Sequence, residues 1–97
     1  METLEFQFST KGKARGRAHI GVVGSGDLEV LLEPRDGPTA TARVRTSVPG
    51  FSRQWKAVLD RFFLQYDKAV AIEINDAGAT PGVVSLRLAQ AAEASES

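Results

Sequence analysis

Ser25 is the side chain in this sequence whose surroundings best suit chemistry on a hydroxyl group. Glycine precedes and follows it, in Gly24-Ser25-Gly26, and Asp27 comes next. Neighbours this small leave the hydroxyl unshielded, so a modifying enzyme could attach a bulky group to it. The alternative interpretation is a plain turn, because Gly-Ser-Gly-Asp is also common turn material.

The other reactive side chains offer Ser25 no partner for catalysis. His19 is the only histidine, and at ~3.3 Å per strand residue it should lie roughly 20 Å from Ser25. A nucleophilic serine needs its base within hydrogen-bond reach, so these two residues cannot form a catalytic pair. The chain has no cysteine, and its acidic residues show no metal-ligand spacing. We therefore expect no catalytic residue and no metal site.

A β-hairpin is expected to present the hydroxyl at its tip. Apolar residues alternate on both sides of the loop, and a shift of one residue would turn every side chain to the wrong face. Only a loop of Gly24–Gly26 brings apolar residues opposite one another. The expected pairs are Val22 with Leu28, Ile20 with Val30, Ala18 with Leu32 and Arg17 with Glu33.

One residue of this loop and the residue that follows it have expected structural roles. Gly26 should adopt a positive φ, which three-residue hairpin loops require and glycine tolerates. Asp27 should hydrogen-bond amides of the turn, as aspartate commonly does in such positions.

Alternating and helical patterns predict the remaining elements. One stripe at helical spacing, between residues 52 and 66, predicts an amphipathic helix. Its apolar members are Trp55, Val58, Leu59, Phe62, Phe63 and Tyr66. Alternation predicts six strands, at Leu4–Phe8, Arg15–Val22, Asp27–Glu33, Ala40–Thr46, Val70–Ile74 and Val84–Leu88.

These elements predict an α+β domain with two layers. Hairpin-length connections favour a mainly antiparallel sheet in the order β-β-β-β-α-β-β, with the one helix covering one face. Residues 1–97 should form a single domain, and residues 90–97 should be frayed.

The opposite face of the sheet should carry the charged residues. It is either a solvated face with cross-strand ion pairs or a surface that binds partner proteins. We predict that Arg43 and Arg45 help to dock partners. The residues assigned to this face are Arg15, Arg17, His19, Arg43, Arg45 and Arg87, with Glu5, Glu29, Glu33 and Glu73.

Composition restricts the possible partners and the compartment. Twelve basic and twelve acidic residues cancel, which gives no reason to expect binding to nucleic acid or to a membrane. No signal peptide is recognisable, and no apolar run approaches the ~20 residues that span a bilayer. We therefore expect a cytoplasmic protein.

Three segments, in this order, resemble one known family. They are Val23–Val30, Thr46-Ser47-Val48 and Gly78–Val84, and the resemblance extends over all but the last few residues. The sequence resembles the acyl carrier (delta) subunits of malonate decarboxylase and, more distantly, the acyl carrier subunits of citrate lyase.

The resemblance implies a function as a carrier without catalytic residues of its own. It implies that Ser25 bears 2'-(5''-phosphoribosyl)-3'-dephospho-coenzyme A through a phosphodiester bond, with Gly24, Gly26 and Asp27 forming the rest of the site. The thiol of that group would carry acetyl and malonyl groups while malonate is converted to acetate and carbon dioxide. The implied partners are acyltransferase and decarboxylase subunits and a prosthetic-group transferase.

Two alternatives stay open. The chain could be a carrier subunit of the citrate lyase type, although Thr46-Ser47-Val48 and Thr80-Pro81-Gly82 favour the malonate system. It could also be an interaction or assembly module whose hairpin is never modified.

Overall fold

Five long strands, one short strand and two helices account for most of the chain. The computed structural model describes all 97 residues. No helix in it is both long enough and apolar enough to cross a lipid bilayer. The strands are β1 (Glu2–Ser9), β2 (Gly12–Lys13), β3 (Ala18–Gly21), β4 (Leu28–Pro34), β5 (Thr39–Thr46) and β6 (Lys68–Asp76), and the helices are α1 (Ser52–Gln65) and α2 (Pro81–Glu96).

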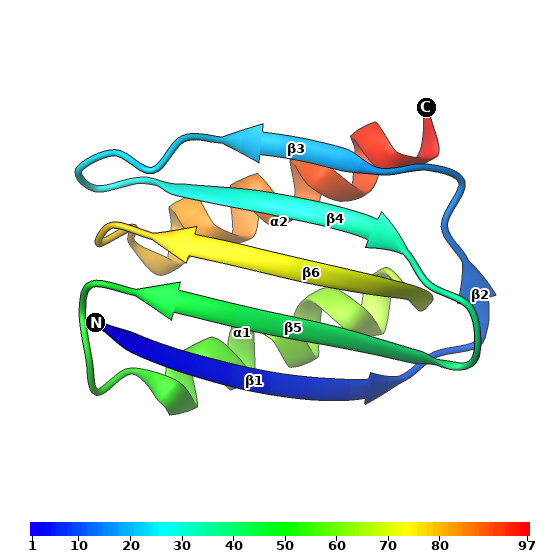
Figure 1. The fold of residues 1–97 in the computed structure, drawn as a ribbon, viewed down its shortest axis with the longest axis horizontal. Helices are drawn as coiled ribbons and strands as arrows, with labels where there is room; N and C mark the ends of the chain where they lie inside the picture. The colour runs from blue at the N-terminus through cyan, green and yellow to red at the C-terminus, as the bar shows by residue number, and fades with distance from the viewer.

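The five long strands form one sheet in the order β1-β5-β6-β4-β3 (Figure 1). Three of its four strand pairs are antiparallel, as predicted. The β5–β6 pair is parallel, because α1 carries the chain back across the sheet between them. The short β2 also runs parallel to the start of β6.

Both helices cover the same face of the sheet, which confirms the two-layer α+β class (Figure 1). The predicted stripe of α1 packs inward, with Trp55, Val58, Leu59 and Phe63 buried. The opposite face of the sheet, called the outer face below, has no helix over it. The fully buried side chains at the centre of the core include Leu28, Val30, Leu32, Val44, Leu59, Ile72, Ile74 and Leu88.

The prediction of a sixth strand at Val84–Leu88 is wrong, because these residues belong to α2. Thr80 caps this helix: its Oγ1 accepts a hydrogen bond from the amide of Val83 at 3.3 Å. Pro81 follows in the first turn, where a missing N–H has no cost. The buried residues of α2 recur at helical spacing, and the alternation that suggested a strand is coincidental. They are Val84, Leu88, Ala91 and Ser95.

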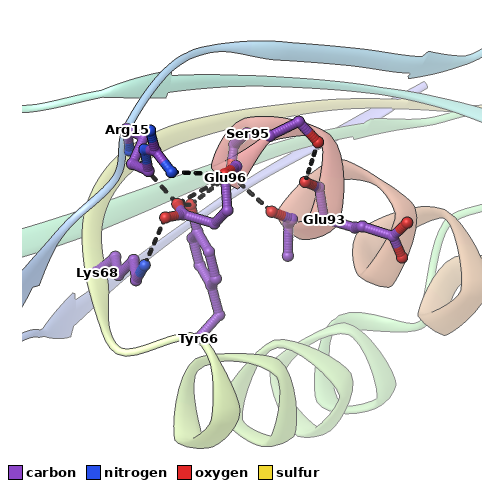
Figure 2. Close-up of polar contacts among 8 residues, drawn as sticks. Arg15, Tyr66, Lys68, Glu93, Ser95 and Glu96 are labelled. Carbon is purple, nitrogen blue, oxygen red and sulfur yellow. Dashed lines mark hydrogen bonds and ion pairs between the residues drawn. The ribbon is translucent and has the colours of Figure 1, made fainter.

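The last residues also differ from the prediction, since α2 continues to Glu96 instead of fraying after residue 90. Figure 2 shows Glu96 at the centre of a polar network. Its carboxylate accepts from Lys68 Nζ at 2.7 Å and from the Tyr66 hydroxyl at 3.0 Å. Burial raises the pKa of Tyr66 to about 12, so the phenol keeps its proton and goes on donating even in moderately alkaline solution. These bonds fix the end of α2 against the end of α1 and the start of β6.

Two arginines assigned to the outer face lie elsewhere. The backbone amide and guanidinium of Arg15 bond to Glu96 at the end of α2, both at 3.4 Å (Figure 2). Arg87 belongs to α2 itself. The remaining assignments fit the register, in which Arg43 lies between Glu5 and Glu73 on neighbouring strands.

Candidate functional site

The hairpin that presents Ser25 has the predicted register. Ala18 pairs with Leu32 and Ile20 with Val30. Just beyond the strand, Arg17 Nη1 lies 3.4 Å from Glu33 Oε1. The loop is longer than predicted, because β3 ends at Gly21 and β4 begins at Leu28. The predicted pair of Val22 with Leu28 is therefore wrong: Val22 lies in the loop and is exposed.

Ser25 occupies a β-turn at the tip of this loop. The carbonyl of Gly24 accepts from the amide of Asp27 at 2.9 Å, which closes the turn. Gly26 has φ +76°, as predicted, and no non-glycine residue has a positive φ. A single positive φ at the third residue is typical of a type II turn, with Ser25 at the second position. Ser25 is exposed, and no part of the protein hydrogen-bonds its hydroxyl.

The turn is joined to the loop that follows β6. The amide of Gly26 donates to the carbonyl of Ala77 at 2.8 Å, and the amide of Ala77 donates to the carbonyl of Asp27 at 2.9 Å. This pair of backbone bonds extends the sheet pattern beyond the strand ends. The backbone around Ser25 is therefore held from a segment fifty residues away in sequence, while the hydroxyl itself stays free.

A second attachment runs from Asp27 to α2. The Asp27 carboxylate accepts from Arg87 Nη2 at 2.8 Å and from Arg87 Nε at 3.1 Å. It also accepts from the amide of Leu28, the first residue of β4, at 2.7 Å, whereas the prediction named amides of the turn. The hydrogen bonds from Arg87 hold the pKa of Asp27 below its usual value, and those to Asp27 raise the pKa of Arg87. The carboxylate beside Ser25 is thus paired with a positive charge.

Replacing Arg87 with glutamine should loosen the turn without unfolding the protein. The bidentate pair would be lost, whereas the backbone bonds to Ala77 would remain. We expect the amides of Gly26 and Ala77 to exchange hydrogen several-fold faster than in the parent protein. Arg53→Gln, in an exposed arginine of α1, is the matched control. Unchanged exchange at both amides would show that Arg87 does not fix the loop.

Gly21 is a structural residue of the site that the sequence reasoning missed. It has φ +80° at the end of β3. A Cβ at this position would collide with the carbonyl oxygen of Leu28 and lie 3.5 Å from Cδ of Arg87. Glycine is therefore needed where the chain leaves the sheet to form the Ser25 loop. The signal was the same as for Gly26, a glycine beside a turn, but the shorter predicted loop placed Gly21 inside a strand.

His19 has a partner other than Ser25. Its Nε2 lies 2.7 Å from Glu29 Oε2 on the outer face, and no hydrogen bond joins it to Ser25. Glu29 also accepts from Asn75 Nδ2 at 2.9 Å. The bonds from Asn75 and His19 lower the pKa of Glu29. No three His, Asp or Glu side chains gather where they could hold a metal ion.

The three segments that carried the resemblance lie at the same end of the molecule (Figure 1). The Ser25 loop, the segment after β5 and the segment after β6 meet there, on the left in that view. Val22 and Val23, which precede Ser25, are 64% and 59% exposed. The loop that carries Ser25 thus also presents two apolar side chains on the surface.

Comparison with known proteins gives consistent matches over nearly the whole chain. Residues 15–95 match the model of the family described as malonate decarboxylase delta subunit (MdcD). The chain is 52% identical, over 96% of its own length and 95% of the relative's, to the malonate decarboxylase acyl carrier protein of Stutzerimonas stutzeri. It is 54% identical, over the same shares, to that of Pseudomonas paraeruginosa.

A solved structure agrees with the sequence matches. The fold is similar, with a TM-score of 0.91 and 49% identity, to a chain in the crystal structure of a Pseudomonas malonate decarboxylase hetero-tetramer in complex with malonate. The similarity covers 97% of this chain and 98% of the other.

Proposed function

The chain belongs to the malonate decarboxylase delta subunit family, and from this we propose that it serves as the acyl carrier subunit of a malonate decarboxylase complex. The observation that carries the proposal is the state of Ser25. Its hydroxyl is exposed and unbonded, yet the backbone around it is held by Ala77 and by the Asp27–Arg87 pair. A carrier needs such a site, which is open to other enzymes and fixed to the body of the protein.

We propose Ser25 as the attachment point of 2'-(5''-phosphoribosyl)-3'-dephospho-coenzyme A. The surroundings fit a bulky phosphodiester, since a Cβ at Gly26 would meet nothing within 4 Å. Arg87 balances the charge of Asp27, so no unpaired carboxylate next to Ser25 opposes a second negative group. When bound, the group supplies a thiol that can form thioesters, which a chain without cysteine lacks.

The chain's own residues position this group and do not act on it. No base is hydrogen-bonded to Ser25, since His19 is paired with Glu29 and Asp27 with Arg87, so a transferase must activate the hydroxyl. Exposed Val22 and Val23 give that transferase an apolar contact next to its target. In this proposal the chemistry on malonate belongs to acyltransferase and decarboxylase subunits, to which the carrier delivers its cargo at high effective concentration.

Measuring intact mass tests the proposal directly. The chain should be heavier than its sequence by one attached group when it is produced together with the modifying enzymes, and unmodified when they are absent. A chain that keeps its sequence mass in the presence of active modifying enzymes would contradict the proposal. It would instead fit an assembly module with an unmodified hairpin.

We further propose that the outer face docks the partner subunits. Arg43 and Arg45 are exposed there, and the ion pair between Arg43 Nη2 and Glu5 Oε2 is a loose 3.8 Å. Shallow hollows flank Ala71 at the centre of the face, one of about 570 Å³ and one of about 620 Å³. A polar face with reversible ion pairs suits a carrier, because a carrier must dock and release repeatedly.

Reversing the charges of Arg43 and Arg45 should weaken the docking of partner subunits with little effect on the stability of the fold. We expect Arg43→Glu with Arg45→Glu to weaken co-purification with the partner subunits at least tenfold. The free energy of unfolding should fall by only about 1 kcal/mol, because the carboxylate at position 43 would face Glu5 and Glu73 but all these groups are at least partly exposed to solvent. The matched control is Arg53→Glu with Arg61→Glu, which makes the same charge change on the exposed side of α1. If only this control weakens assembly, the docking surface lies on the helix.

A further inference from the structure

A third hollow, of about 290 Å³, opens between the ends of β5 and β6 and the starts of the two helices. We call it the Trp55 hollow. Most of its wall is apolar, and its main lining side chains are Val48, Trp55, Val58, Ala79, Pro81 and Val84. The ends of β5 and β6 that border it are at the same end of the sheet as the Ser25 loop (Figure 1).

Asp76 fixes the two segments that form this wall. Its carboxylate accepts from Thr46 Oγ1 at 2.8 Å, from the amide of Gly78 at 3.2 Å and from the amide of Ala79 at 3.0 Å. Asp76 is 6% exposed and Thr46 is fully buried. The segments Thr46–Val48 and Gly78–Val84 are therefore held in place before any ligand arrives. These are the two segments of the family resemblance to which the proposed function gives no role.

Trp55 supplies a hydrogen-bond donor without an acceptor. The side chain is 7% exposed, and no group of the protein accepts from its indole N–H. No buried polar side-chain atom lacks a partner, so this N–H must reach solvent. We infer that this free donor faces the hollow, because Trp55 is one of the residues that line it. An apolar wall with one donor suits a small apolar group that carries one carbonyl oxygen. The carboxylate of Asp76 in the same wall disfavours a ligand with a carboxylate of its own.

The hollow is within reach of a group attached to Ser25. Ala77 bonds to the turn through Gly26 and Asp27, and the next residue, Gly78, lines the hollow. Consecutive Cα atoms lie about 3.8 Å apart and paired strands about 5.5 Å apart, which places Gly78 within about 13 Å of Ser25. A long flexible group could fold back over this distance.

We propose that the Trp55 hollow receives the acetyl thioester end of the group carried on Ser25, with the indole N–H of Trp55 donating to the thioester carbonyl. This inference rests on the proposed function. Binding there would shield the thioester from water between visits to the partner subunits. The acetyl form should bind in preference to the malonyl form, whose carboxylate would approach Asp76.

The single tryptophan makes the test direct. The chain labelled with ¹⁵N at the indole is compared by NMR in its unmodified, thiol, acetyl and malonyl forms. We expect the indole N–H resonance to move downfield in the acetyl form, with a smaller change or none in the malonyl form. Trp55→Phe keeps an aromatic ring without the donor, and in it the acetyl thioester should hydrolyse about fivefold faster.

The other possible results distinguish a failure of the inference about the hollow from a failure of the carrier function. An indole resonance that is the same in the thiol and acetyl forms overturns the inference, while the mass of the attached group still supports the carrier function. A shift that appears only when partner subunits are added assigns the hollow to a partner side chain and also overturns it. Failure of the chain to gain mass at all refutes the carrier function, and the inference with it.

Discussion

Ser25→Ala is expected to abolish covalent loading completely while leaving the fold intact. The bonds that shape the turn join backbone atoms of Gly24, Gly26, Asp27 and Ala77, and none involves the serine side chain. Removing an exposed, unbonded hydroxyl should change the free energy of unfolding by less than ~0.5 kcal/mol. Intact mass after incubation with the modifying enzymes, together with thermal unfolding, measures both effects.

A serine elsewhere on the surface provides the control. Ser52 is exposed at the start of α1, and its side chain caps nothing, so Ser52→Ala should load like the parent protein. If Ser25→Ala still gained the mass of the group, the attachment point would have to be another residue. Peptide mapping of that product would then identify it.

Gly21→Ala is expected to have the largest effect on stability. The new Cβ would collide with the carbonyl oxygen of Leu28, and an L-residue disfavours φ +80°. Relief requires the backbone to move where β3 pairs with β4, which would pull the Ser25 loop away from Ala77. We expect the free energy of unfolding to fall by at least ~2 kcal/mol, measured by urea denaturation.

A comparison with Gly26→Ala separates the steric collision with Leu28 from the cost of the positive φ. Gly26 has nearly the same φ, +76°, but an added Cβ would have nothing within 4 Å. The conformational cost alone should then apply, about 1 kcal/mol. Equal losses for the two variants would mean that the contact with Leu28 is relieved at no cost and that only φ matters.

The hairpin was predictable because local pattern decides its register. Apolar alternation on the two strands fits in only one way, and the observed pairs Ala18–Leu32 and Ile20–Val30 follow it. The loop length was less predictable. Gly21 leaves the extended conformation two residues earlier than alternation suggests, and a sequence does not show at which residue a strand ends.

The second helix was missed because small residues weaken its amphipathic pattern. Ala91 and Ser95 complete the buried stripe of α2, but neither is an apolar signal as strong as leucine. Thr80 followed by Pro81 was the available clue, since this pair favours a helix start. The prediction followed instead the alternation of Val84, Leu86 and Leu88, which favours a strand. Leu86 proves to be 53% exposed.

The Asp27–Arg87 pair could not be found without the fold. Sixty residues separate the two side chains, and only the placement of α2 over β3 and β4 brings them together. Once Arg87 was assigned to a strand, its expected position was on the wrong side of the sheet. The error in one element therefore hid the group that fixes the Ser25 loop.

The order of strands in the sheet determines when, during synthesis, the turn around Ser25 can take up its final structure. β6 is the central strand, yet it follows β1 to β5 in the chain, and Ala77 comes directly after it. Because the ribosome makes a chain from its N-terminus, Ser25 emerges long before Ala77 and Arg87 exist. The nascent chain therefore exposes the serine on an unfixed loop. A transferase that recognises the fixed turn, as in the proposed function, would therefore act only after the chain is complete and folded.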